Sequence, residues 1–192
     1  MTTAAEMLQS EFASYADVIH AHATERPDAG AIVASGRRLT FAQLDGYGIL
    51  RAGSCVAPLA QSSTPEALEL MLADSGATLY FADANIASEM TVPDTVTHVA
   101  LDSDAAFEAW LPEEGSVPSP VEIDPEQGFN IIYSSGTTGT PKGIVHSHQM
   151  RWRQVTAFGG AIFTPETTAI LSTPLYSNTT LVTFLPCLGN GG

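Results

Sequence analysis

Short strand-like segments alternate with helix-like segments along this chain, and this alternation constrains the fold more than any other feature. Runs of apolar and β-branched residues typical of buried strands occupy 54–60, 78–82, 95–101, 129–135, 143–147 and 168–174. Helix patterns occupy 11–25, 63–76, 147–158 and 180–188. Because strands and helices alternate when helices connect parallel strands, we predict an α/β fold with a largely parallel sheet and flanking helices.

Local end signals support several of these elements. The helix expected at 63–76 has Thr64 as a candidate N-cap and Gly76 just after its end. Thr40 and Gln43 have the spacing of a capping box, which predicts a second helix, and two short strands are expected to form a hairpin before it, around a Ser35-Gly36 turn. Ser147 is a candidate cap for the helix at 147–158, and Pro186 is expected to break the helix at 180–188.

The charge of the chain changes sign along its length. Residues 1–126 contain four arginines and twenty acids, a net charge of −16, whereas residues 127–192 have three cations and one acid, a net charge of +2. The total of −14 argues against nucleic-acid binding, which needs clustered cations. We interpret the acidic part as a solubilising surface and place any anion binding in the second part.

The composition indicates a globular protein of the cytoplasm. Hydrophobic residues make up 44% of the chain and charged residues 15%, which argues against general disorder. The two cysteines, Cys55 and Cys187, are too few for a disulfide framework, so we expect reduced thiols. The first residues do not resemble a secretory signal, and no apolar run approaches the width of a bilayer, so no membrane span is expected. The oligomeric state is not predicted.

The stretch "YSSGTTGTPKG" at 133–143 holds Lys142, the only lysine of the chain, and predicts a phosphate-binding loop. Glycines let the backbone approach an anion, exposed N–H groups and hydroxyls can donate to it, and a lysine adds a positive charge. The loop is not a Walker A motif, because Pro141 stands where a glycine should precede the lysine, and no G-x-G-x-x-G is present. The alternative is a flexible turn without a ligand. The predicted phosphate-binding residues are Ser134, Ser135, Gly136, Thr137, Thr138, Gly139, Thr140, Lys142 and Gly143.

The same eleven residues closely resemble the signature of the adenylate-forming superfamily, which comprises acyl-CoA synthetases, luciferases and the adenylation domains of peptide synthetases. Further resemblance covers most of the chain outside 83–125, in the segments "LTFAQLD" at 39–45, "GIVHSH" at 143–148 and "TPLYSNTT" at 173–180, and in the strand–helix–strand segment 49–83. The resemblance places His148 on the usual histidine of the family. It implies part of the large N-terminal domain of an enzyme most like an acyl-CoA synthetase.

The resemblance also implies a two-step ligase reaction. A carboxylate attacks the α-phosphate of Mg²⁺-bound ATP to give an acyl-adenylate and pyrophosphate, and a thiol, commonly coenzyme A, then takes the acyl group. Lys142, Thr137 and Thr138 are the implied catalytic residues, acting on the leaving pyrophosphate. Tyr176, Ser177 and Asn178 are implied to line the pocket of a small-molecule carboxylate, with Ser177 standing where acyl-CoA synthetases often have histidine. The carboxylate itself is not identified.

Other residues suggest weaker alternatives. His146 and His148 have a metal-ligand spacing, but no nearby cysteine or carboxylate completes a site, so no metal ligands are predicted. Arg151 and Arg153 are expected to face different directions on a helix, with one or both solvated. Trp152 between them is a candidate interface anchor.

The resemblance predicts an incomplete member of the superfamily. The resemblance implies that the end of one helix, a strand and most of the next helix are missing between Asp45 and Ile49. The acidic magnesium-binding motif, the ribose-binding aspartate and the lysine of the C-terminal domain have no counterpart, so the 192 residues are expected to be inactive alone. We divide them into 1–111, a connecting loop at 112–126, and a phosphate-loop region at 127–192. The alternative is a non-catalytic nucleotide- or phosphate-binding module, or an enzyme remnant.

Overall fold

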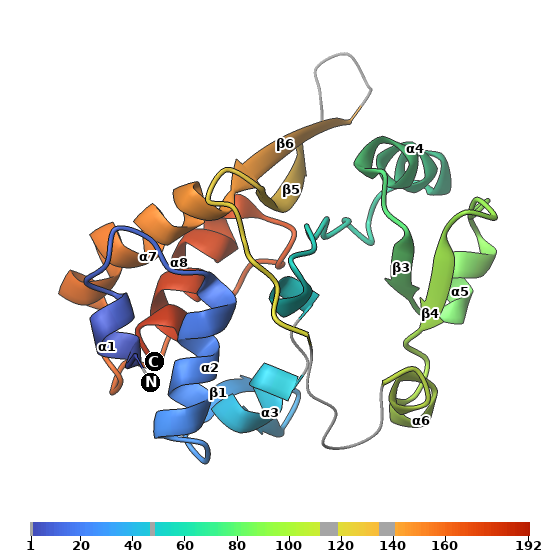
Figure 1. Cartoon of the computed structure of the whole chain (residues 1–192). Coiled ribbons are helices and arrows are strands. Elements are labelled where there is room, and N and C mark those ends of the chain that lie inside the picture. Colours follow the sequence, from blue (N-terminus) through green and yellow to red (C-terminus); the bar gives the residue numbers. More distant parts are fainter. Residues whose placement is uncertain (1, 47–48, 112–118, 135–140) are drawn as a thin grey trace. The chain divides into compact units, whose positions relative to one another are not determined.

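A computed structural model of the chain describes residues 2–46, 49–111, 119–134 and 141–192 (Figure 1). The chain forms two compact units. Unit 1 comprises residues 1–56, 119–130 and 145–192, and unit 2 comprises residues 57–118 and 131–144. Parts of the predicted connecting loop (112–118) and of the predicted junction (47–48) lie outside the described residues.

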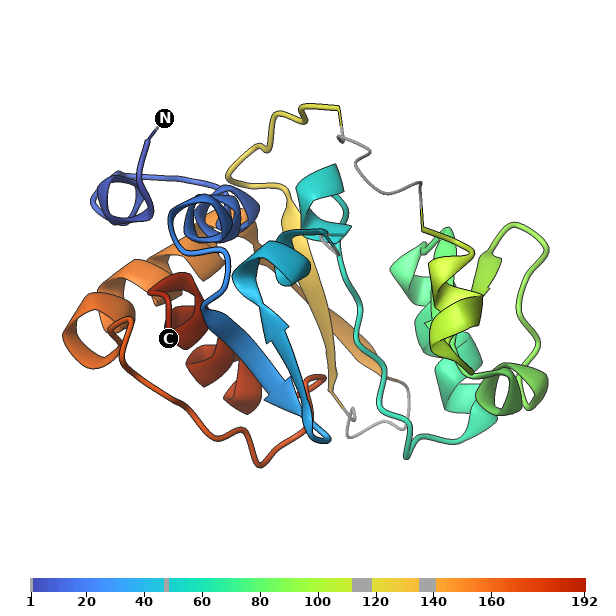
Figure 2. The same ribbon diagram turned by 90° about the horizontal axis from the view of Figure 1, so that it is seen from below.

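Unit 1 is mainly helical, with one hairpin of strands. Helix α8 contacts both α7 and α2, and Figure 2 shows α8 in red beside α7 in orange. Ser14 and Ser147 cap α2 and α7 through their side chains, the second as predicted. The elements of this unit are α1 (Ala4–Met7), α2 (Tyr15–Glu25), β1 (Gly30–Ala34), β2 (Arg37–Thr40), α3 (Phe41–Gly46), η1 (Ile49–Ala52), α7 (His148–Ile162) and α8 (Asn178–Gly189).

The hairpin and the capping box are confirmed. Strands β1 and β2 are antiparallel, and positive φ angles at Ser35 (50°) and Gly36 (76°) match a turn that suits the twist of a two-residue hairpin. The backbone N–H of Thr40 donates to Oε1 of Gln43 over 3.0 Å, and the N–H of Gln43 donates to Oγ1 of Thr40 over 3.3 Å. These reciprocal bonds satisfy two backbone donors at the start of α3.

The predicted break at Pro186 is wrong, because α8 continues through this residue to Gly189. Pro186 lies near the C-terminal end of the helix, where it removes one backbone hydrogen bond without interrupting a long stretch. Its own carbonyl accepts from the N–H of Asn190 over 3.1 Å and from Nδ2 of the same residue over 2.8 Å. Burial of Leu185 and Leu188 on either side further stabilises this last turn.

Two predicted strands are absent from the described residues. In 54–60 only Val56 forms a bridge, a parallel one to Asn130, and Pro58 has no N–H to donate. The segment 168–174 forms no strand and exposes its two large apolar residues, Ile170 and Leu171, with Ile170 90% exposed. Both predictions were wrong because an apolar run becomes a strand only where a neighbouring strand accepts its backbone hydrogen bonds.

Unit 2 pairs two parallel strands beside a well-capped helix. Thr64 Oγ1 accepts from the N–H of Ala67, and Gly76 ends the helix at a φ of 63°, as predicted. Strands β3 and β4 pair in parallel from Leu79↔Thr97 to Ala82↔Ala100. The elements are α4 (Pro65–Ser75), β3 (Leu79–Ala82), α5 (Ala84–Ser88), β4 (Thr97–Ala100) and α6 (Asp104–Glu108).

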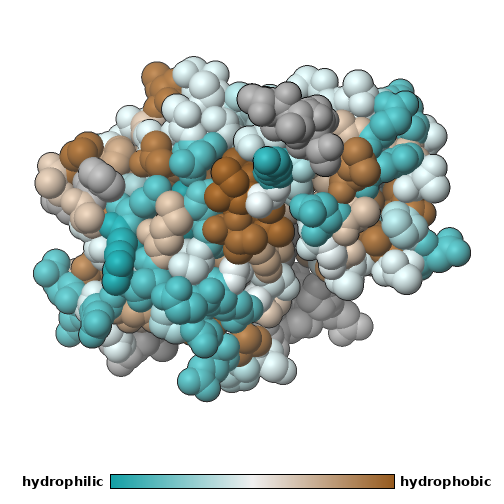
Figure 3. Space-filling view, turned by 90° about the horizontal axis from the view of Figure 1, so that it is seen from above, coloured by the Kyte–Doolittle hydropathy of each residue, from teal (hydrophilic) through white to brown (hydrophobic). Residues whose placement is uncertain are grey.

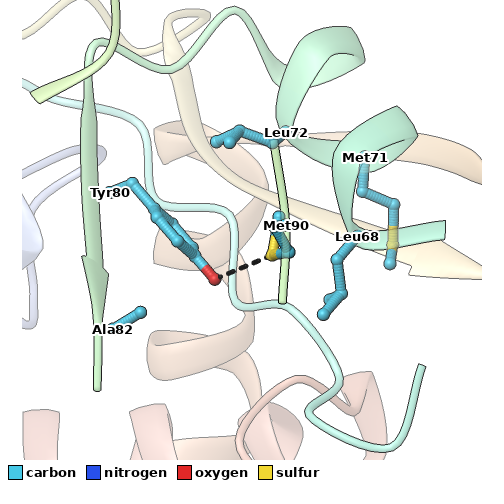
Figure 4. Packing of buried hydrophobic residues seen from close by; sticks show 6 residues of the cluster. All are labelled: Leu68, Met71, Leu72, Tyr80, Ala82 and Met90. Carbon is cyan, nitrogen blue, oxygen red and sulfur yellow. Dashed lines mark hydrogen bonds between the residues drawn. The ribbon is translucent and has the colours of Figure 1, made fainter. Parts of the chain in front are cut away.

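The core of unit 2 forms where α4 packs on β3. Figure 4 shows its members from α4, β3 and the segment after α5, with a hydrogen bond of 3.3 Å from the hydroxyl of Tyr80 to Sδ of Met90. Tyr80 and Ala82 are two residues apart in β3, so their side chains point to the same side of the strand, toward α4. The buried cluster consists of Leu68, Met71, Leu72, Tyr80, Ala82 and Met90.

Strands β5 (Gly128–Ser134) and β6 (Lys142–Ser147) form the third two-stranded sheet. They enclose residues 135–140 in the sequence and therefore position both ends of the predicted phosphate loop. With helices and both parallel and antiparallel pairs present, the predicted α/β class is confirmed. No helix of the described residues is long and apolar enough to span a membrane. On the face in Figure 3, hydrophobic residues lie in separate groups among hydrophilic ones.

Candidate nucleotide site

The two strands β5 and β6 present the ends of the phosphate loop. Ser134 is the last residue of β5, Lys142 is the first residue of β6, and both are exposed. Exposure leaves the Lys142 ammonium accessible to an anion. The predicted site residues that lie outside the described residues are Ser135, Gly136, Thr137, Thr138, Gly139 and Thr140.

Gly143 follows Lys142 at a place where the backbone is closely surrounded. A Cβ atom on this glycine would lie 2.9 Å from Cγ2 of Ile131, 3.1 Å from Oδ2 of Asp74 and 3.1 Å from Cε1 of Tyr133. A side chain would therefore have to displace its neighbours. Gly143 lets β6 start close against β5 and α4, immediately after the lysine.

Tyr133 connects β5 to the C-terminal turn of α4. Its hydroxyl lies 2.8 Å from Oδ2 of Asp74 and 3.0 Å from the carbonyl oxygen of Met71, and it donates toward both acceptors. Burial raises the pKa of Tyr133 above its ordinary value, and the hydrogen bond to the Asp74 carboxylate and the charge of that carboxylate raise it further. The phenol therefore stays neutral and keeps its proton for this contact. The sequence offers no signal for the pair, because 59 residues separate Tyr133 from Asp74.

We expect Tyr133→Phe to destabilise unit 2 by about 1 kcal/mol, because Asp74 and Met71 lose a hydrogen-bond donor. Urea unfolding followed by circular dichroism measures the change. Tyr80→Phe is the matched control in the same unit. Among the described residues its hydroxyl bonds only to the thioether of Met90, a weak acceptor. Equal losses in the two variants would contradict a specific role for the Tyr133 contact.

The predicted carboxylate-pocket residues lie at the start of α8 in unit 1. Ser177 is the N-cap of the helix, but its side chain makes no capping hydrogen bond. Asn178 is the first helical residue, and its Oδ1 accepts from Nη1 of Arg151 over 3.0 Å. Tyr176 is half-buried just before them. These three residues belong to unit 1, whereas Tyr133, Lys142 and Gly143 belong to unit 2.

Helix α7 places its two arginines in different environments. Arg153 is exposed, as expected for a solvated residue, but Arg151 is completely buried. Burial lowers the pKa of Arg151 to about 10, so its guanidinium remains charged near neutral pH. Trp152 is 2% exposed and packs edge-on against Phe12, so the interpretation of Trp152 as an interface anchor is wrong. Sequence reasoning missed the burial of Arg151 because the residues that surround it are far away in the chain.

Two histidines of unit 1 are buried beside aromatic rings, His22 beside Phe41 and His148 beside Phe129. His148 packs edge-on against Phe129, and burial lowers its pKa. His22 donates from Nε2 to the carbonyl oxygen of Gly189 over 2.9 Å, and burial lowers its pKa as well. Both histidines are therefore neutral in the folded chain near pH 7.

These pKa shifts predict that unit 1 loses stability as the pH falls below about 6.5, the ordinary histidine value. In that window the unfolded chain binds protons that His22 and His148 do not bind when folded, so protonation favours unfolding. The slope is at most about 1.4 kcal/mol per pH unit for each histidine. Urea unfolding at several pH values measures it, and His148→Gln should flatten the dependence. A stability that is unchanged between pH 7 and pH 5 would contradict the assignment.

A comparison with protein families shows which family the chain belongs to. Residues 46–192 match the family model described as AMP-binding enzyme, which is more than half of the chain. The chain belongs to the AMP-binding enzyme family. This AMP-binding chain thus carries its loop, "YSSGTTGTPKG", inside the matched region, as the resemblance to adenylate-forming enzymes predicted.

Curated relatives of this AMP-binding chain include very large synthetases. It is 38% identical over 108 residues to the nonribosomal peptide synthetase easA of Emericella nidulans, covering 56% of this chain and 2% of that protein. It is 34% identical over 102 residues to gramicidin S synthase 2 of Brevibacillus brevis, covering 53% of this chain and 2% of that protein. The chain therefore spans only a small part of these relatives.

Solved structures of adenylate-forming enzymes share the fold. VinN in complex with L-aspartate has a TM-score of 0.81 at 19% identity, over 93% of this chain and 56% of VinN. The peptide synthetase FmoA3 bound to α-methyl-L-serine-AMP has a TM-score of 0.73 at 22% identity, over 93% of this chain and 23% of FmoA3. A protein from Rhodopseudomonas palustris, assigned as a long-chain-fatty-acid CoA ligase, has a TM-score of 0.74 at 19% identity, over 94% of this chain and 56% of that protein.

Proposed function

We propose that this protein, in its longest natural form, activates a small carboxylate with ATP. The observation that carries the proposal is the phosphate loop of an AMP-binding chain, which ends on the exposed and unique Lys142 at the start of β6. The sequence itself predicts phosphate binding there. The fold shared with FmoA3 bound to an aminoacyl-AMP supports adenylation as the reaction.

In the proposed reaction a carboxylate oxygen attacks the α-phosphorus of ATP. The bond from that phosphorus to the bridging oxygen breaks, and pyrophosphate leaves with the electron pair. Negative charge therefore grows on the leaving oxygens, and donors already placed around them lower the barrier. We assign this role to Lys142, Thr137 and Thr138, with the loop glycines giving the backbone access to the phosphates.

Mg²⁺ is proposed to arrive with ATP. Magnesium in such sites keeps several waters and is held by one or two carboxylates together with substrate phosphates. Within the part of the chain that the structure describes, no three or more histidine, cysteine, aspartate or glutamate side chains gather into a metal cluster. The ATP phosphates would supply most of the ligands of the ion, which would offset their negative charge.

Tyr176, Ser177 and Asn178 are proposed to line the carboxylate pocket, at the N-terminus of α8. Peptide backbone N–H groups at a helix start favour negatively charged groups, which suits this location. For the second step we propose transfer to the thiol of coenzyme A. A thiol on a carrier protein is the alternative, and the peptide synthetases among the curated relatives favour it. A reaction of this kind is consistent with the predicted cytoplasmic location.

Carboxylate-dependent exchange of pyrophosphate into ATP tests the first step. The longest natural form of the protein is assayed with Mg²⁺, ATP, labelled pyrophosphate and a panel of aliphatic, aromatic and amino acids. We expect exchange with at least one acid and none without acid. Exchange with no acid of a broad panel would favour the non-catalytic phosphate-binding module instead. The preferred acid is then incubated with coenzyme A or a carrier protein, and the thioester product identifies the acceptor.

A further inference from the structure

Arg151 is a buried cation without an acidic partner. It lies in the first turn of α7 and is completely buried, and among the described residues no carboxylate pairs with it. A buried charge is costly unless it is paired, and an apolar side chain would fill the same space more cheaply. The presence of an arginine here therefore calls for a role that an apolar residue lacks.

The hydrogen bonds of Arg151 connect α8 to the part of β5 that belongs to unit 1. Its Nε donates to Oδ1 of Asn130 in β5 over 2.8 Å, and its Nη1 donates to Oδ1 of Asn178 in α8 over 3.0 Å. A third bond, from Nη1 to Oε1 of Gln154 over 2.7 Å, orients the guanidinium from within α7. The planar guanidinium thus bridges β5 to the first residue of α8, and only Nη2 has no partner.

The bridge ends at the first residue of α8. The side chain of Ser177 makes no capping hydrogen bond. The hydrogen bond from Arg151 to Oδ1 of Asn178 is therefore a side-chain contact that can fix the first residue of the helix. Thr180 adds a bond from its hydroxyl to the carbonyl oxygen of Pro174, on the other side of the turn. The N-terminus of α8 carries partial positive charge, and the guanidinium of Arg151, bonded to Asn178, adds a full positive charge beside it. Such a concentration of positive charge favours an anion at the start of α8.

We propose that Arg151 is a positioning residue of the carboxylate pocket, which fixes the turn 176–178 through Asn178 and supplies the positive charge that attracts the substrate carboxylate. The proposal deepens the proposed function and depends on it for the identity of the substrate. The bridge between β5 and α8 can be tested separately, by a measurement that needs no activity.

Amide hydrogen exchange tests the bridge. The N–H groups of Thr180 and Leu181 bond to the carbonyl oxygen of Ser177, so their exchange rates report on the first turn of α8. We expect Arg151→Met to speed exchange at these two amides about tenfold, because a charged hydrogen bond is lost. Arg153→Met, two residues along on the same helix but exposed, is the matched control and should leave them unchanged.

Pyrophosphate-exchange kinetics in the longest natural form test the role in the pocket. Arg151→Met should raise KM for the carboxylate about tenfold and leave KM for ATP unchanged. Arg151→Lys keeps the charge but loses the bridge, and should give a smaller rise. A general loss of folded protein would lower the apparent kcat and leave both KM values unchanged. A rise in KM for the carboxylate alone therefore separates positioning from a merely structural role.

Two results would overturn the proposal: unchanged exchange at Thr180 and Leu181 in Arg151→Met, or equal rises in both KM values. Where Arg151→Met does not fold, Asn178→Ala replaces it, since this variant removes only the α8 end of the bridge. Asn178→Ala should also speed exchange at the two amides, and unchanged rates there would be equally decisive against the bridge. If the wild-type protein exchanges no pyrophosphate with any acid, the proposed function fails, and with it the substrate role of Arg151, whereas the amide measurement still judges the bridge.

Discussion

Lys142→Ala is expected to lower kcat/KM for carboxylate-dependent pyrophosphate exchange about 100-fold, because the loop then loses the one lysine that can offset the charge of the leaving pyrophosphate. The side chain is exposed at the start of β6, so its removal should leave the fold intact. The loss should therefore lie in transition-state stabilisation and phosphate affinity. Initial rates at varied ATP and varied acid measure it in the longest natural form of the protein.

Arg153→Ala is the control for Lys142, since it also removes one exposed positive charge from the C-terminal region. It changes the net charge of the protein by the same amount, so a general electrostatic effect on ATP would appear in both variants. Activity of Lys142→Ala within about twofold of wild type would contradict the assignment of this lysine to the leaving group. Unchanged unfolding in urea would confirm that both variants are folded.

Leu72→Ala is expected to destabilise unit 2 by about 2–5 kcal/mol, because it removes buried methyl groups and leaves a cavity. Leu72 is 3% exposed and belongs to the cluster between α4 and β3 (Figure 4). A loss of this size is a large part of the stability of a small unit. Urea unfolding followed by circular dichroism, or by amide exchange within residues 79–82, measures it.

Leu70→Ala is the matched control, because it makes the same chemical change two residues away on α4. Leu70 is 54% exposed, so its truncation should change stability by no more than about 0.5 kcal/mol. Alanine is also the better helix former, which offsets part of any lost contact. Similar losses for Leu70→Ala and Leu72→Ala would show that α4 does not pack on β3 as described.

The phosphate loop remains a prediction from the sequence, since residues 135–140 lie outside the described residues. The loop "YSSGTTGTPKG" is one continuous stretch of sequence. Its residue types can therefore indicate phosphate binding without any knowledge of contacts to distant parts of the chain. The supports of the site were not predicted. In the sequence Asp74 looks like an ordinary helix acid and Arg151 like a surface cation. The partner of Asp74 is Tyr133, and Arg151 bonds to Asn130 and Asn178, all of them distant in the chain.

The sequence by itself determined the features that depend on a few adjacent residues: the hairpin around Ser35-Gly36, the capping box at Thr40, the ends of α4 and the family of the loop. Capping and turn formation are local, so the residues that satisfy the backbone are already in sequence order. Only the tertiary structure decided that 168–174 forms no strand and that Arg151 bridges β5 to α8. Strand pairing and burial require partners that are distant in sequence, and only the folded chain brings those partners together.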